Sequence, residues 1–411
     1  MNDQKSGMMF THVIPLFCES VRLKVSKREV HLSTPAILAL ADGSIFHGTA
    51  IGAEGHALGE VAFSTAMSGY QELLTDPASA GQLLALTYPH IGNSGINPQD
   101  GESDRIQAAG LIIRDLPLTA SNWRSTCSLQ AFLLDAGTVG IADIDTRRLV
   151  RILREKGTQH GCIMAGADAS EEKALERVRG FAGAQDQDQT ATVTTRTSYN
   201  WNEAPWQLAS NSHPQVPTEQ LPWKVVVYDF GVSRSLLRDL VAKGCQLSVV
   251  PADTPAAEVL AQKPHGVVLS SGPGNAAACT GAIETVKALL DAGVPLFGVG
   301  LGHQLLALAS GAQLKRLSVS RIGVNQPVKD LANGHALISS QHHSYVVDAA
   351  SLPATLQLTH TSLLDDSVQG IAVNGKPAIG FQGIPHVSNE PNTSSAFYDR
   401  FGELMQQAHK A

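Results

Sequence analysis

Residues 294–311 read VPLFGVGLGHQLLALASG, and this stretch decides the fold. It begins with an uncharged apolar run, places glycine at alternate positions from Gly298 to Gly302, and continues with leucine and alanine at helical spacing. A short apolar run before glycines predicts a buried strand, and the leucine-rich part predicts a packed helix. The stretch therefore predicts a strand, a sharp turn and a helix, which is the geometry of a nucleophile elbow.

A glycine-rich turn after a strand can also bind a dinucleotide. That fingerprint needs Gly-x-Gly-x-x-Gly and an acidic residue about 20 residues further on. Here His303 takes the place of the last glycine, and no acidic residue follows at that spacing. The pattern favours an elbow with Gly300 at its tip, where a nucleophile would stand.

Length and composition indicate a globular protein with two or three domains, since 43% of its 411 residues are hydrophobic. The net charge is −7, and no basic block is interleaved with aromatic residues, so we expect neither nucleic acid nor a membrane surface as a partner. The five cysteines are scattered without Cys-x-x-Cys pairs, which predicts a reducing, cytoplasmic location. No apolar run approaches the roughly 18 residues of a membrane span.

Changes in composition and hydrophobic periodicity divide the chain into four parts. Residues 1–34 form an extension without clear periodicity, residues 35–182 form a β-rich domain, and residues 183–223 form a polar linker. Three tryptophans indicate that this linker lies along a domain surface. Residues 224–411 alternate strands with helices, which predicts a doubly wound, mostly parallel α/β sheet with its site at the carboxyl ends of the strands.

The elbow resembles the Gly-x-Cys-x-Gly-His-Gln elbow of class I glutamine amidotransferases. The β-rich domain resembles the amino-terminal domain of the carbamoyl-phosphate synthetase small-subunit family, a domain that other class I amidotransferases lack. The blocks that carry this likeness are, in order, residues 59–65, 67–72, 75–77, 86–93, 110–117, 142–147 and 153–157. The resemblance implies a class I amidotransferase fold for residues 224–411.

The resemblance also implies a Cys-His-Glu triad, which this sequence lacks. Gly300 stands where the cysteine belongs. The family's Phe-Gln-Gly-His-Pro-Glu motif reads FQGIPH over residues 381–386, so Ile384 replaces the histidine and His386 replaces the glutamate. Hydrolysis of the glutamine amide needs a nucleophile, a base and a group that orients the base. We therefore expect no glutaminase activity.

The family's contacts to glutamine carry over only in part, which implies a vestigial glutamine pocket. The matching positions are Gly272, Gly274, Leu301 and Gln304, and the altered ones are Ala78, His342, Ser344 and Tyr345. A family loop of the form Phe-Gly-His-His-Gly reads VSRIG over residues 319–323. The changes therefore gather at the mouth of the former site.

The resemblance implies a partner, because small subunits of this family dock on a large subunit that uses ATP. We expect no cofactor in this chain, and glutamine or ammonia as its small ligands. The leading interpretation is a glutaminase-inactive partner or regulatory subunit of an ammonia-using large subunit. Its carbamoyl phosphate would serve pyrimidine or arginine biosynthesis.

Three other interpretations stay open. The chain could be a working glutamine-dependent subunit in which Cys279 supplies an unrecognised nucleophile. It could carry a new site, because His303, His342, His343 and His386 come from segments that the family fold brings near one pocket. Within that hypothesis His342, His343 and His386 are candidate metal ligands. Alternatively, it could be a free-standing binding protein that has lost the synthetase.

Overall fold

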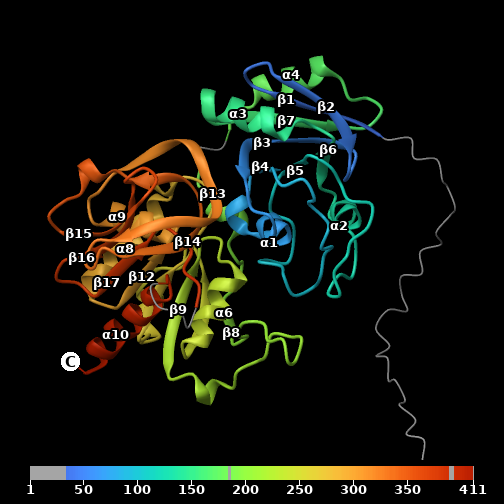
Figure 1. The fold of residues 1–411 in the computed structure, drawn as a ribbon. Coiled ribbons are helices and arrows are strands. Elements are labelled where there is room, and N and C mark those ends of the chain that lie inside the picture. The colour runs from blue at the N-terminus through green and yellow to red at the C-terminus, as the bar shows by residue number, and fades with distance from the viewer. Residues whose placement is uncertain (1–33, 184–186, 388–392, 411) are drawn as a thin grey trace, which may run out of the picture. The chain divides into compact units, whose positions relative to one another are not determined.

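The computed structural model describes residues 34–183, 187–387 and 393–410 (Figure 1). The extension expected over residues 1–34 therefore lies, except for Thr34, outside the described residues. Residues 34–411 form one compact unit. Among the described residues, no helix is long and apolar enough to cross a membrane.

The amino-terminal part is built on a closed ring of seven strands. The ring runs β2–β1–β7–β3–β4–β5–β6 and returns to β2, so none of these strands is left with a long free edge. The strands are β1 (Pro35–Leu40), β2 (Ile45–Ala50), β3 (Gly55–Ser64), β4 (Gln82–Leu86), β5 (Gly110–Ile113), β6 (Val139–Ala142) and β7 (Gln159–Ala165). We call this part the barrel. Its helices are α1 (Tyr70–Thr75), η1 (Pro77–Ser79), α2 (Leu129–Asp135), α3 (Thr146–Lys156) and α4 (Glu171–Gly180).

The first hairpin of the barrel confirms the sequence prediction. Gly43 adopts φ 91°, which glycine accepts at little cost, and the carboxylate of Asp42 accepts a hydrogen bond of 2.9 Å from the backbone of Ser44. Leu38 and Ile163 on paired strands are fully buried together in the barrel core. Turn chemistry and the continuous burial of β1 therefore specify this hairpin.

The segment expected to be a linker contains regular structure that the sequence did not predict. Helix α5 (Thr190–Val193) and strand β8 (Tyr199–Trp201) lie within it, and β8 pairs antiparallel with β10 (Cys245–Pro251) at the sheet edge. A three-residue strand shows too little periodicity to be recognised. The expectation that its tryptophans lie on a domain is confirmed, since Trp201 and Trp223 pack on the core and Arg124 lies 4.6 Å above the Trp206 ring.

The carboxy-terminal part is a mixed α/β fold around a parallel sheet, as expected. Its parallel strands run in the order β10–β9–β11–β12–β17. Helices connect these strands along the chain. The strands are β9 (Trp223–Asp229), β11 (Gly266–Leu269), β12 (Leu296–Val299) and β17 (Ala378–Phe381), and the helices are α6 (Arg234–Ala242), α7 (Ala256–Ala261), η3 (Ala276–Ala278), α8 (Thr280–Ala292), α9 (Leu301–Ala309) and α10 (Ala396–Lys410). Both faces of this sheet are covered, because Val225 and Val227 face one core and Val226 and Tyr228 face the other.

An antiparallel extension continues the sheet in the order β17–β16–β15–β13–β14. Its strands are β13 (Leu314–Asp330), β14 (Ala336–Val347), β15 (Leu356–Ser362) and β16 (Val368–Val373). Residues 319–323, which the resemblance assigned to a loop, lie inside β13, so that expectation is wrong. Irregular register between Arg316 and Arg321 breaks the alternation that would reveal the strand. Ile322 of β13 also pairs with Ser64 of the barrel.

Candidate functional site

The elbow has the backbone geometry of a nucleophile-bearing turn. Gly300 lies between β12 and α9 at φ 57° and ψ −111°, a conformation that costs any residue with a side chain roughly 1–3 kcal/mol. Its N–H donates to the carbonyl of Phe381 at 2.9 Å, and the N–H of Gly302 donates to Ser270 at 3.0 Å. The turn is therefore fixed from two neighbouring strands, and the elbow prediction is confirmed.

The elbow tip has room for a side chain that the sequence does not supply. A Cβ atom on Gly300 would lie 3.2 Å from Cβ of Ser271 and 3.9 Å from the carbonyl oxygen of Gln382. The Cβ atom would fit if Ser271 moved by a few tenths of an ångström. A Cβ atom on Gly302 would instead lie 2.1 Å from the carbonyl oxygen of Leu269. Glycine is thus required by packing at 302, but only by backbone conformation at 300.

Residues 382–387 follow β17 beside the elbow and carry no carboxylate, and His386 is their one imidazole. The N–H of Ile384 donates to the carbonyl of Ser340 at 2.8 Å, which places an aliphatic residue at the family's histidine position. The His386 side chain is 49% exposed. Its Nε2 lies 3.2 Å from Oγ of Ser340 and its Nδ1 lies 3.8 Å from the carboxylate of Asp239. His386 therefore interacts with α6 and β14.

The matching positions of the glutamine pocket serve packing around the elbow. Nε2 of Gln304 donates to the carbonyl of Tyr345 at 2.8 Å and to Oε1 of Gln382 at 3.2 Å. Leu301 is 3% exposed. A Cβ atom on Gly272 would lie 2.1 Å from the carbonyl oxygen of Phe230, so close backbone approach also requires that glycine. Gly272, Leu301 and Gln304 therefore have a structural role at the elbow.

His342 links β14 to the barrel. Its Nε2 lies 3.0 Å from Oε1 of Gln82 and its Nδ1 lies 3.4 Å from Oδ2 of Asp76. The other carboxylate oxygen of Asp76 accepts from the backbone of Ala78 at 3.0 Å. The His342 side chain is only 4% exposed. Two altered pocket positions, Ala78 and His342, thus share one carboxylate, a contact that sequence spacing could not reveal.

Ser344 and Tyr345 line a cavity of about 270 Å³ with Gly274 and residues of the barrel. Hydroxyl groups of Ser344 and Ser320 lie 2.8 Å apart, and Ser320 donates to Glu60 at 2.6 Å. The second carboxylate oxygen of Glu60 accepts from Arg316 at 2.6 Å. No sequence pattern indicates this network, because Ser320 and Glu60 are 260 residues apart.

The histidine-site hypothesis is not supported. His342 contacts Asp76 while His386 contacts Asp239. His303 and His343 are buried. In residues 34–183, 187–387 and 393–410, no group of three or more His, Cys, Asp or Glu side chains is arranged to hold a metal ion.

Burial keeps two histidines neutral. It lowers the pKa of His303 to about 4. Burial, aided by the nearby Arg321 guanidinium, lowers the pKa of His343 to about 3. The imidazolium form is disfavoured because a buried charge is poorly solvated.

These two pKa values contribute a loss of stability in mild acid. The unfolded chain binds protons at histidine near its ordinary pKa of about 6.5, and the folded chain does not until about 4 or 3, so the contribution of these histidines to stability falls as pH drops below 6.5. For each histidine, the free energy of unfolding should fall by up to about 1.4 kcal/mol per pH unit in this range. Burial raises the pKa of Glu72 to about 7, and this carboxyl group opposes the effect of one histidine over the same pH range. Urea midpoints measured between pH 7.5 and 5 check this.

The test variant is His343→Gln, which should remove part of the slope, and the exposed His47→Gln is its surface control. The comparison does not depend on the absolute stability of either variant, because it uses only the change in the free energy of unfolding with pH. An unchanged slope in His343→Gln would contradict the assignment.

Cys279 is unsuited to be a replacement nucleophile. The residue is 1% exposed, and its thiol donates to Oδ1 of Asp188 at 3.3 Å. Burial, reinforced by the Asp188 carboxylate, raises the pKa of this thiol to about 12. A reactive cysteine needs the opposite environment, because the thiolate is the nucleophile.

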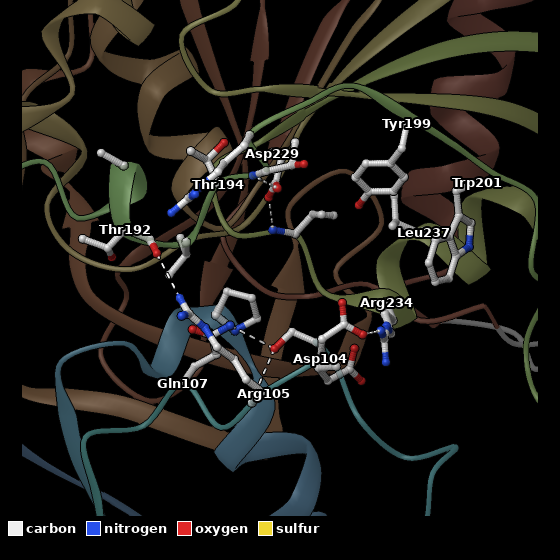
Figure 2. Close-up of a pocket in the computed structure, with 18 of the residues that line it drawn as sticks. Asp104, Arg105, Gln107, Thr192, Thr194, Tyr199, Trp201, Asp229, Arg234 and Leu237 are labelled. Carbon is white, nitrogen blue, oxygen red and sulfur yellow. Dashed lines mark hydrogen bonds and ion pairs between the residues drawn. The ribbon is translucent and has the colours of Figure 1, made fainter. Parts of the chain in front are cut away.

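A polar cleft of about 820 Å³ lies between the barrel, the segment before β8, and α6 (Figure 2). Arg105 donates to the carbonyl of Thr192 at 3.1 Å, and Asp104 pairs with Arg234. Its lining contains three arginines and three carboxylates, so its charges are balanced. These contacts join the 102–107 segment to the carboxy-terminal part and supply no group to the elbow.

The parallel sheet, the elbow at its carboxyl edge and the segment after β17 define a class I amidotransferase domain. Residues 226–404 match the family described as "Glutamine amidotransferase class-I". Residues 38–163 match "Carbamoyl-phosphate synthase small chain, CPSase domain". The chain belongs to the carbamoyl-phosphate synthase small chain family, and this membership implies a large-subunit partner.

Curated relatives match nearly the whole chain. A carbamoyl phosphate synthase small chain from Pseudomonas aeruginosa is 55% identical over 376 residues, covering 92% of this chain and 100% of that protein. One from Stutzerimonas stutzeri is 54% identical, covering 91% of this chain and 97% of that protein. A solved glutamine amidotransferase from Thermotoga maritima is 18% identical, covers 46% of this chain and 84% of that one, and has a TM-score of 0.32.

Proposed function

We propose that this chain is a glutaminase-inactive small subunit that acts as a partner or regulator of a large subunit using free ammonia. The observation that carries the proposal is the elbow tip. Gly300 keeps the strained conformation of a nucleophile position, at φ 57° and ψ −111°, without bearing a side chain. The scaffold of the reaction is present and its reactive atom is absent.

The neighbouring groups support the same conclusion. Ile384 offers no proton acceptor, and His386 contacts Ser340 and Asp239. The thiol of Cys279 is neutral at physiological pH because its pKa is raised to about 12. The family's reaction needs a thiolate, an imidazole that acts as the base and a carboxylate that orients this imidazole. No described side chain near the elbow replaces them.

The altered pocket also argues against glutamine as a substrate. His342 occupies a family contact position and engages Gln82 and Asp76 of the barrel. Ser344 engages Ser320 and Glu60. Polar groups already bonded to each other must be separated before they can bind a ligand, which weakens binding. We infer that retention of the fold serves the large subunit.

No contact in the described structure specifically favours one of the three other interpretations. A working glutaminase would need Cys279, whose thiol is buried and neutral. A histidine-lined metal site would need a group of ligands arranged to hold an ion, and the described residues contain none, while His342 bonds to Gln82 and His386 to Ser340. A free-standing protein without the synthetase is distinguished by co-purification with the large subunit.

Reconstitution tests the proposal directly. The purified chain is combined with its large subunit, and carbamoyl phosphate formation is measured with ammonium chloride or with glutamine as nitrogen source. We expect product from ammonium, altered in rate or KM by adding this chain, and no product from glutamine above the blank. Glutamine-dependent synthesis, or a thioester trapped on this chain by a glutamine analogue, would overturn the proposal.

A further inference from the structure

An arginine-lined cleft lies on the barrel, away from the elbow. The cleft measures about 670 Å³ and is formed by α3, the end of β5 and the segments that follow β3 and β4. Its cationic lining residues are Arg114, Arg147, Arg148, Arg151 and Arg154. Cavities of roughly 300–1,000 Å³ are typical of small-molecule sites. The cleft is therefore large enough for a ligand, and we call it the arginine cleft.

The helix places its arginines on one side. Arg147 and Arg151 are four residues apart, and Arg154 follows three residues later, so the three share one face of α3. Two guanidinium groups are steadied by aromatic rings, because Arg148 lies 4.7 Å above the Phe46 ring and Arg154 lies 5.5 Å above another ring. A guanidinium held by stacking loses less entropy on binding.

Acidic residues neutralise only part of the positive charge of the cleft, and one such ion pair joins Nε of Arg114 to the Asp115 carboxylate at 4.0 Å. Only two acidic residues, Asp145 and Glu155, line it beside five arginines. The Asp145 carboxylate accepts from the backbone of Arg148 at 2.8 Å, which caps α3. In the part of the chain that the structure describes, no carboxylate pairs with the four arginines of α3. The chain as a whole carries a net charge of −7, so this concentration of cations is local.

The remaining polar lining also consists of hydrogen-bond donors. Thr65, Thr87 and Thr146 contribute hydroxyl groups. Guanidinium forks match the paired oxygens of a phosphate group, whereas they have no acceptor to offer a cation or a sugar hydroxyl. The chemistry of the lining therefore selects an anion with several oxygens.

We propose that the arginine cleft binds a small molecule carrying phosphate, with Arg147 and Arg151 as its main contacts. Arg114 faces them from the end of β5 and closes the other side of the cleft. This inference goes beyond the proposed function and is independent of it, because the cleft lies in the barrel and uses no residue of the elbow.

Calorimetric titration of the full chain with inorganic phosphate and with pyrophosphate tests the inference. Both probes should bind saturably, with pyrophosphate tighter because it engages more guanidinium groups. The double variant Arg147→Ala/Arg151→Ala should weaken pyrophosphate binding by at least about tenfold, as expected for loss of charge-assisted hydrogen bonds. The side chains are exposed, so these variants should fold normally.

Arg179→Ala is the matched control, because Arg179 is an exposed arginine of the same part of the chain on α4, outside the cleft. It should leave the affinity unchanged. Equal losses in the control and the double variant would show non-specific charge binding and overturn the proposal. Absence of saturable binding tighter than about 1 mM would do the same.

Addition of the large subunit separates a ligand site from a docking surface. Binding of pyrophosphate to the complex, with the same loss in the double variant, supports the proposal. The large subunit could instead prevent pyrophosphate from binding, and the double variant could fail to bind the large subunit. These two results together would show that the cleft is a protein contact and that the proposal is wrong.

Discussion

Ammonia release from glutamine should stay at the blank in the Gly300→Cys variant and rise by at least about 100-fold when Ile384→His and His386→Glu are added. The members of a catalytic triad act as a unit, so one restored residue recovers almost nothing. In a serine hydrolase the complete triad contributes about 10⁶ in kcat. The recovery should therefore be strongly non-additive.

The backbone supports this expectation. Val299 pairs with Phe381, and the N–H of Gly300 donates to the carbonyl of Phe381 at 2.9 Å. Residues 300 and 384 thus follow the carboxyl ends of two neighbouring strands. A cysteine at 300 needs a shift of a few tenths of an ångström from Ser271.

The recovered activity should remain below the full contribution of a complete triad, because the glutamine pocket is altered. Adding His342→Asn and Ser344→Gly, the residues of the family's segment, should lower KM more than it raises kcat, since the resemblance places these positions in the glutamine pocket and not among the reacting groups. The single variants Ile384→His and His386→Glu are the controls and should stay at the blank. Activity in Gly300→Cys alone would show that another base is present and would contradict the proposed loss of the triad.

The sequence predicts the elements with strong periodicity. The elbow, the hairpin at Asp42 and the strand–helix alternation after residue 224 were all found where expected, because local turn chemistry and burial agree there. Strand β13 was missed because its register shifts break the alternation. Strand β8 was missed because three residues carry little pattern.

The site was predicted at the level of positions and not of contacts. Comparison with the family's motifs predicts that Gly300, Ile384 and His386 replace reactive side chains. The contact of His342 with Asp76 joins residues far apart in the chain, and only tertiary packing brings them to 3.4 Å. The metal-ligand candidates His342, His343 and His386 belong to no group arranged to hold an ion among the described residues, since which neighbour each imidazole meets depends on packing.

Alanine at two elbow glycines should have very different effects on stability. Gly302→Ala should reduce the free energy of unfolding by about 4 kcal/mol or more, because its Cβ would lie 2.1 Å from the carbonyl oxygen of Leu269. That oxygen belongs to a central strand and cannot move without disturbing the sheet. Gly300→Ala should cost only about 1–2 kcal/mol, since its strain comes from φ 57° and its nearest neighbour is 3.2 Å away.

Gly281→Ala completes the series as a matched control. Gly281 lies in helix α8, and a Cβ atom added there would meet nothing within 4 Å, so alanine should stabilise the protein by about 0.5–1 kcal/mol. Urea unfolding of the three variants gives the ranking. If Gly300→Ala proved as damaging as Gly302→Ala, the tip would have no space for a nucleophile, and the elbow could not be the remnant of a catalytic site. The stability ranking therefore tests the evolutionary interpretation of Gly300 without any assay of activity.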